Sequence, residues 1–152
     1  MFAALVGEAR RRHWYVEGEI PDTLDGRFAV LATIVALAIV RLERGGEAAQ
    51  IEAVALTERF VGAMDAEHRQ LGLGDPALGK KVRRLVGSLA RRVELWRHAV
   101  VSADGWADAV GGSLPGDSRS PDALAHCGSA LRKFWARLEA ASDESLAEGR
   151  IG

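Results

Sequence analysis

Apolar residues recur along most of the chain with the three- and four-residue spacing of an α-helix, and glycine or proline separates one periodic stretch from the next. No stretch alternates apolar and polar residues as a half-buried strand would. The expected fold is therefore all-α, a single-domain multi-helix bundle of about five to six helices. The pattern places these helices over residues 1–12, 22–44, 47–70, 76–102 and 121–141, with a further helical turn or two over 103–110.

The stretch 22–44 is apolar on most of its sides. Its apolar run from Phe28 to Val40 is interrupted only by Thr33 and is too short for a bilayer span, which needs about 20 residues. A helix without a polar face is covered by other helices, so this one is expected at the centre of the bundle. Asp22 is expected to cap its N-terminus, and Gly45 follows its end.

Positive charge is concentrated in the helix expected over 76–102. Seven Lys and Arg side chains stand between residues 80 and 98 with Glu94 as the one acid among them, whereas the whole chain has a net charge of −1. A solvated helix face often carries such charge, but this surface would also attract RNA phosphate, anionic lipid headgroups or an acidic protein. The candidate partner-binding residues are Lys80, Lys81, Arg83, Arg84, Arg91 and Arg92.

The composition is that of an ordinary globular domain. With 152 residues, 48% of them hydrophobic, the chain can bury a core without a disulfide or a metal. Cys127 is the sole cysteine, so no disulfide framework can form within the chain. The basic cluster Arg10 to Arg12 follows the first apolar residues, which is the wrong order for a secretory signal, and a cytoplasmic protein is expected. Residues 142–152 are acidic and small and are expected to fray.

Residues suited to catalysis or metal binding are few and scattered. The four histidines stand apart in the sequence, whereas metal sites on helices usually show several paired His and acidic residues. Asp65, Glu67 and His68 form the cluster on which a helical enzyme could be centred. Residues 72–75 precede a helix, but no strand leads into them, and the negative Asp75 favours a helix cap over a phosphate loop. No catalytic residue, metal or cofactor is expected.

Two short strings carry a family resemblance. The first is Pro21-Asp22-Thr23-Leu24-Asp25-Gly26-Arg27-Phe28, which follows Trp14-Tyr15; the second comprises Met64-Asp65, Leu71-Gly72-Leu73-Gly74-Asp75, Gly79-Lys80-Lys81-Val82 and Arg92. Together they resemble the ubiquinol–cytochrome c reductase assembly chaperone family, which is related to the mitochondrial cytochrome b translation and assembly factor. The resemblance covers roughly residues 1–102, and the C-terminal third is similar only in its helical character. The chain departs from the family pattern at Ala63, His68, Pro76 and residues 89–91.

The resemblance implies an all-helical, non-enzymatic chaperone that occupies residues 1–141 and binds newly made cytochrome b during assembly of the respiratory bc1 complex. The absence of a transit peptide and the Ala- and Arg-rich composition fit a bacterial member, located in the cytoplasm or at the cytoplasmic face of the inner membrane. Further implied partners are the ribosome near its tunnel exit and a small partner protein, and the charge of the basic helix adds an anionic membrane surface as a candidate partner. The alternative is a basic-helix binding module for ribosomal RNA or anionic membrane without a dedicated client.

The motif residues are expected to support the fold more than to contact a client. Aromatic residues suit either purpose, so Trp14, Tyr15, Trp96 and Trp106 are expected to line a client groove or to pack in the core. The charged residues of the first string are expected to clamp their loop onto a neighbouring helix. The structural motif residues are Trp14, Pro21, Asp22, Asp25, Gly26, Arg27, Phe28, Asp65, Gly72, Gly74, Asp75 and Gly79.

Overall fold

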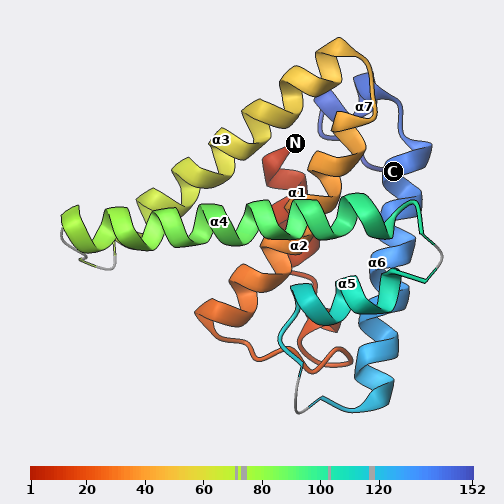
Figure 1. Ribbon diagram of the computed structural model, residues 1–152, viewed down its shortest axis with the longest axis horizontal. Coiled ribbons are helices and arrows are strands. Elements are labelled where there is room, and N and C mark those ends of the chain that lie inside the picture. The colour runs from red at the N-terminus through yellow and green to blue at the C-terminus, as the bar shows by residue number, and fades with distance from the viewer. Residues whose placement is uncertain (71, 73–74, 103, 117–118) are drawn as a thin grey trace.

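The computed structural model describes residues 1–152 except 71, 73, 74, 103, 117 and 118, and the described residues form helices and no strands (Figure 1). This confirms the all-α prediction. The side chain of Asp75 also lies outside the described part. The elements are α1 (Phe2–Ala9), the 3₁₀ helix η1 (Arg12–Trp14), α2 (Leu24–Glu43), α3 (Glu47–Gln70), α4 (Asp75–Ala99), α5 (Trp106–Ser113), α6 (Pro121–Ala140) and α7 (Asp143–Ala147).

α2 runs through the centre of the bundle, as its apolar sequence predicts. It packs against α1, α3, α4, α5 and α6, and all but one of its residues from Ala29 to Val40 are buried. Thr33 lies in this run and donates its hydroxyl hydrogen to the carbonyl oxygen of Ala29 at 2.7 Å. Because its polar group is paired inside the helix, Thr33 is buried without an unsatisfied hydrogen bond.

The N-terminus of α2 is capped by Thr23 and not by Asp22, so the expected cap is wrong by one residue. Thr23 is extended, and its hydroxyl oxygen accepts a hydrogen bond from the Gly26 amide at 3.1 Å. Asp22 instead accepts a hydrogen bond from the Arg27 guanidinium at 2.6 Å. The Asp22 carboxylate therefore binds Arg27 and does not cap the helix.

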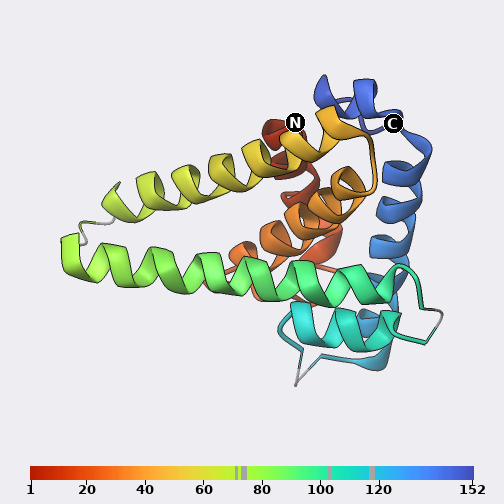
Figure 2. The same ribbon diagram turned by 45° about the horizontal axis from the view of Figure 1, so that its top comes forward.

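α3 and α4 are the two longest helices and form a V, with α1 and α2 between its arms (Figures 1 and 2). α4 packs on α2 through an apolar stripe, in which Leu85, Leu89, Val93 and Trp96 are buried. α6 contacts α2 and α5, away from the point where the V closes. The V thus projects from a body made by the remaining helices.

The C-terminal residues are folded, which contradicts the expectation that 142–152 fray. Ser142 caps α7 by accepting a hydrogen bond from the Ser145 amide, and Leu146 is fully buried. Asp143 forms an ion pair with Arg41 at 2.9 Å and accepts a hydrogen bond from the Gly46 amide at 3.0 Å. These contacts with the end of α2 and the start of α3 hold a segment whose composition alone suggests a tail.

The structure brings together two histidines that the sequence separates. His13 Nδ1 and His126 Nε2 lie 3.0 Å apart, so the 3₁₀ turn after α1 is joined to α6. Next to this pair, the Arg119 guanidinium donates a hydrogen bond to the Gly18 carbonyl at 3.0 Å, and Glu19 accepts hydrogen bonds from Ser120. The N-terminal segment therefore rests on α6 through a polar junction.

Acidification is expected to weaken this junction. A hydrogen bond between two imidazoles needs one ring nitrogen without a proton, and burial together with the nearby Arg11 and His126 lowers the pKa of His13 below 6.5. A pKa lowered by folding means that stability is full above the unfolded value and is lost as the pH falls through the folded value. The free energy of unfolding in urea should therefore fall more for the wild type than for His13→Gln between about pH 7.5 and about pH 5. Equal losses in the two proteins would contradict this assignment.

Cys127 is buried in α6, and burial raises the pKa of its thiol.

Among the described residues, no helix is both long enough and apolar enough to cross a membrane.

Candidate functional site

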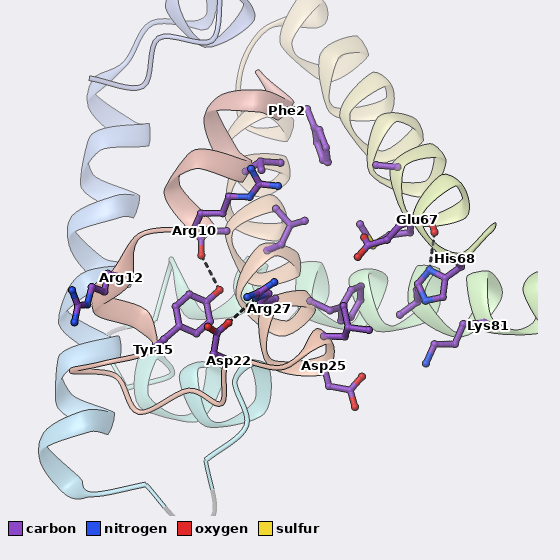
Figure 3. Close-up of a pocket in the computed structure, with 18 of the residues that line it drawn as sticks. Phe2, Arg10, Arg12, Tyr15, Asp22, Asp25, Arg27, Glu67, His68 and Lys81 are labelled. Carbon is purple, nitrogen blue, oxygen red and sulfur yellow. Dashed lines mark hydrogen bonds and ion pairs between the residues drawn. The ribbon is translucent and has the colours of Figure 1, made fainter. Parts of the chain in front are cut away.

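A groove of about 920 Å³ opens between α1, the turns before α2, the first turns of α2, the last turns of α3, and α4 (Figure 3). We call it the α1–α4 groove. Its apolar lining comes from helices far apart in the sequence, because α1, the start of α2, α3 and α4 all contribute side chains to it. This lining includes Phe2, Val6, Phe28, Leu31, Met64 and Leu85.

Phe28 lines the groove and is held by two neighbouring side chains. Its ring lies 5.9 Å from the ring of Phe60, a fully buried residue of α3, measured between centroids. The guanidinium carbon of Arg92 stands 5.7 Å from the Phe28 ring centroid. Such ring and cation contacts fix the orientation of an aromatic side chain, so Phe28 presents a rigid surface.

Two large apolar side chains at the edge of the groove are exposed to solvent. Val16, in the turns before α2, is 52% exposed, and Leu24, the first residue of α2, is 57% exposed. Single exposed apolar residues are common on protein surfaces, but these two adjoin a groove that is itself apolar. Together they extend the apolar surface that a binding partner would meet.

The groove has a charged rim. Arg10 and Arg12 lie on one side, and Glu67 and Lys81 lie on the other (Figure 3). The exposed ion pair of Asp22 and Arg27 lies between them, and the hydrogen bond from Arg27 lowers the pKa of the Asp22 carboxyl.

Tyr15 is the aromatic residue of the rim. Its hydroxyl donates a hydrogen bond to the Ala9 carbonyl at 2.9 Å, and burial raises the pKa of its phenol, so this donor stays protonated.

Residues from both motif strings meet in this groove. Asp22, Asp25, Arg27 and Phe28 of the first string line it together with Met64 and Lys81 of the second. The sequence predicts a structural role for most of them and does not reveal that they share one cavity. The charged residues of the first string do form a structural ion pair, Asp22 with Arg27, but it joins the turn before α2 to α2 itself and not to a neighbouring helix.

Other motif residues are placed where they support the fold. Trp14 is buried, and its indole N–H donates to the Glu8 carbonyl at 3.0 Å. A Cβ at Gly26 would lie 1.9 Å from the Pro21 carbonyl oxygen, so only glycine fits there. Gly72 has a φ of +80° in the turn between α3 and α4. Gly74 and the side chain of Asp75 lie outside the described residues.

Trp96 and Trp106 pack in the core and do not line the groove. Their rings make an edge-to-face contact with centroids 4.8 Å apart, and both are buried. Their indole N–H groups donate to the Ser113 hydroxyl and the Gly128 carbonyl, respectively. Of the four aromatic residues considered from the sequence, Tyr15 alone is among the groove-lining residues.

Asp65, Glu67 and His68 do not converge as a catalytic site would require. The Asp65 carboxylate accepts a hydrogen bond from Arg69 at 3.0 Å, and His68 Nδ1 lies 2.7 Å from the Met64 carbonyl oxygen. The described residues contain no group of three or more His, Cys, Asp or Glu that could hold a metal ion. The geometry thus gives no support to an enzyme centred on this part of α3.

The basic candidates on α4 separate into an exposed group and a buried residue. Lys80, Arg83, Arg84 and Arg91 are exposed, and Lys81 is half-buried at the groove. Arg92 is a correction to the sequence prediction, because it is only 6% exposed. Its guanidinium donates two hydrogen bonds to the Ser113 carbonyl, at 3.1 and 2.7 Å, so it joins α4 to α5 and is not part of the basic surface.

Comparisons with known proteins give a consistent result. The model of the family described as ubiquinol-cytochrome C chaperone matches residues 17–151. The crystal structure of the Cbp3 homolog from Brucella abortus is similar to this chain at 27% sequence identity and a TM-score of 0.81, over 97% of this chain and 83% of that one. Among the curated proteins none matches significantly. The family match includes α5, α6 and α7, so the resemblance is wider than the 1–102 that the motifs alone indicate.

Proposed function

The chain belongs to the ubiquinol-cytochrome C chaperone family, and we propose that it assists assembly of the bc1 complex by binding newly made cytochrome b in the α1–α4 groove. The observation that carries this assignment of the site is the meeting of both motif strings in that groove. The function is that of a binding protein without catalytic activity, since the groove offers apolar contact and charge but no converging acid, base or nucleophile.

The chemistry of the groove suits an apolar helical segment. A helix satisfies its own backbone hydrogen bonds, so it can lie against side chains that offer few partners for a peptide backbone. The apolar lining around Phe28 supplies contact area, and the rim charges can pair with the polar residues that flank a transmembrane segment. Cytochrome b, as a membrane protein, would expose such segments before it is assembled.

We expect the protein to act in the cytoplasm and at the cytoplasmic face of the inner membrane. There the ribosome near its tunnel exit and a small partner protein are the further contacts that the family resemblance suggests. A bacterial origin is part of the same proposal.

Site-specific photo-crosslinking in the native cell tests the proposal. A photoreactive residue is placed at Val16 or at Leu24, both of which are exposed beside the groove. Matched controls are Val101 and Leu124, which are exposed apolar residues outside the groove lining. We expect covalent adducts with cytochrome b from the two groove positions and not from the controls.

The companion measurement is the amount of assembled bc1 complex and of haem b in a strain that lacks the gene. We expect both to fall. Normal bc1 and haem b levels in the deletion strain would contradict the proposal. Crosslinks from the groove positions only to proteins unrelated to this complex would also contradict it.

A further inference from the structure

The outer face of α4 carries cations that have no ion-pair partner within the described part of the chain. Lys80, Arg84 and Arg91 follow at intervals of four and seven residues, which places them on one line along the helix. All three are exposed, and so is Arg83 beside them. Arg91 makes a single long contact, 3.5 Å to the Gly112 carbonyl oxygen. We call Lys80, Arg83, Arg84 and Arg91 the basic ridge.

Many other arginines of the protein are neutralised by a nearby carboxylate. Arg41 pairs with Asp143 at 2.9 Å, and Arg137 pairs with Glu8 at 2.9 Å. Even on α4, the last arginine, Arg97, pairs with Glu43 at 2.7 Å. The cations of the basic ridge differ from these three arginines because no carboxylate of the described residues pairs with them, and Glu94, the acid nearest to Arg91 on α4, pairs with Arg97 and His98 instead.

The shape of the ridge favours a flat partner. α4 runs straight along one arm of the V (Figure 2), and Lys80 and Arg91 are separated by about 16 Å along its axis at 1.5 Å per residue. The ridge lies opposite the buried Leu89 and Val93, so it is convex. A convex line of charge can lie on a plane, whereas a groove would be needed to enclose a single strand.

The residue types on this face favour lipid over RNA. Trp96 is the one Trp, Phe or Tyr of α4, and it is fully buried. No Trp, Phe or Tyr ring of this helix is thus available to stack with a base, and such stacking is the usual source of affinity for single-stranded RNA. The exposed ring of His98 lies 3.2 Å from the Glu94 carboxylate and is engaged with it. Between the cations the exposed residues are small, Gly87 and Ala90, which allow the charged side chains to approach a surface closely.

We propose that the basic ridge docks the protein on an anionic phospholipid surface by electrostatic attraction alone. Lys81 and Leu85, on the adjoining face of the same helix, line the α1–α4 groove. Docking through the ridge would therefore hold the groove beside the bilayer, where a transmembrane client enters or leaves the membrane. Only this placement of the groove rests on the proposed function; the lipid binding itself does not.

Vesicle co-sedimentation with the purified full chain tests the docking. The probes are vesicles of phosphatidylcholine alone and vesicles with equal parts of phosphatidylcholine and phosphatidylglycerol. We expect binding to the anionic vesicles only, and weaker binding as salt is added, because exposed charges are screened. The double variant Lys80→Gln, Arg84→Gln should bind about 25-fold more weakly, at about fivefold for each cation removed.

A matched control removes the same charge elsewhere. Lys133→Gln together with Arg150→Gln changes two exposed cations of α6 and the C-terminal segment, and it should bind like the wild type. Lys80→Arg together with Arg84→Lys keeps the charge and should also bind normally. Thermal unfolding of all variants shows whether each is folded before its binding is compared.

Three results would overturn the inference. They are equal binding to both kinds of vesicle, wild-type affinity in the Lys80→Gln, Arg84→Gln variant, and binding of a structured RNA without binding of anionic vesicles. Because the purified chain is used without a client, none of these outcomes bears on cytochrome b binding. Conversely, absence of groove crosslinks in the cell would leave vesicle binding unaffected, so the two proposals fail separately.

Discussion

Replacing Arg92 with alanine is expected to lower the free energy of unfolding by about 3–4 kcal/mol, the largest effect foreseen for a single charged residue of α4. The Arg92 guanidinium donates to the carbonyl oxygens of Ser113 and Ser88 and to the Ser88 hydroxyl. Removing it leaves these acceptors without their donor and opens a cavity beneath Phe28, whose ring it faces.

Burial lowers the pKa of Arg92 to about 10, because its charge lies in a poorly solvated place beside neutral acceptors. The neighbouring Arg91→Ala is the matched control, because that side chain is exposed and its removal should change stability by less than about 0.5 kcal/mol. Arg92→Met, which restores volume without hydrogen bonds, separates the loss of packing from the loss of donors. Urea unfolding measures all three, and equal stability of Arg91→Ala and Arg92→Ala would contradict the role assigned to Arg92.

Introducing aspartate at both Val16 and Leu24 is expected to reduce affinity for the client about 100-fold and assembled bc1 complex to nearly the level of a deletion strain. Both side chains are more than half exposed at the edge of the groove, so replacing them should change the free energy of unfolding little. A bound apolar segment would lose two contacts and would have to desolvate two carboxylates. Leu24 is moreover the first residue of α2, where an acidic side chain is favourable to the helix dipole.

The control for this variant is the double replacement Val101→Asp, Leu124→Asp, which places the same two charges on exposed apolar positions outside the groove lining. It should leave bc1 levels unchanged. Thermal unfolding verifies that both variants are folded, and haem b spectra of membranes report the assembled complex. Normal bc1 levels with the Val16→Asp, Leu24→Asp protein would exclude this edge of the groove from client binding.

Periodic elements could be predicted from the sequence because their determinants are local. The apolar stripe of α4 and the all-round apolar character of α2 place the correct faces inside, and Ser120 caps α6 as its position before Pro121 predicts. The cap of α2 shows the limit of such reasoning, since Asp22 and Thr23 are both good caps. The choice between them is made by Arg27, which competes for the carboxylate.

The groove and the burial of Arg92 could not be predicted in this way. Phe2, Phe28, Met64 and Leu85 meet only after four segments are packed, and none of them is unusual in its own helix. Arg92 pairs with a backbone carbonyl at Ser113, and a backbone acceptor leaves no trace in the residue pattern. Its residue type groups Arg92 with the exposed cations, although it stands seven residues after the buried Leu85 and therefore on the same side of α4.

The bond between Arg92 and Ser113 also sets a lower limit on the size of a working fragment. A truncated chain that ends near residue 102 would keep every groove-lining side chain but would lack α5, and with it the acceptor that Arg92 uses. A guanidinium without that acceptor would turn toward solvent, so the helix that carries Lys81 and Leu85 would lose its anchor to α5. Shortened variants of this protein should therefore be made by trimming surface loops, and they should keep the C-terminal third.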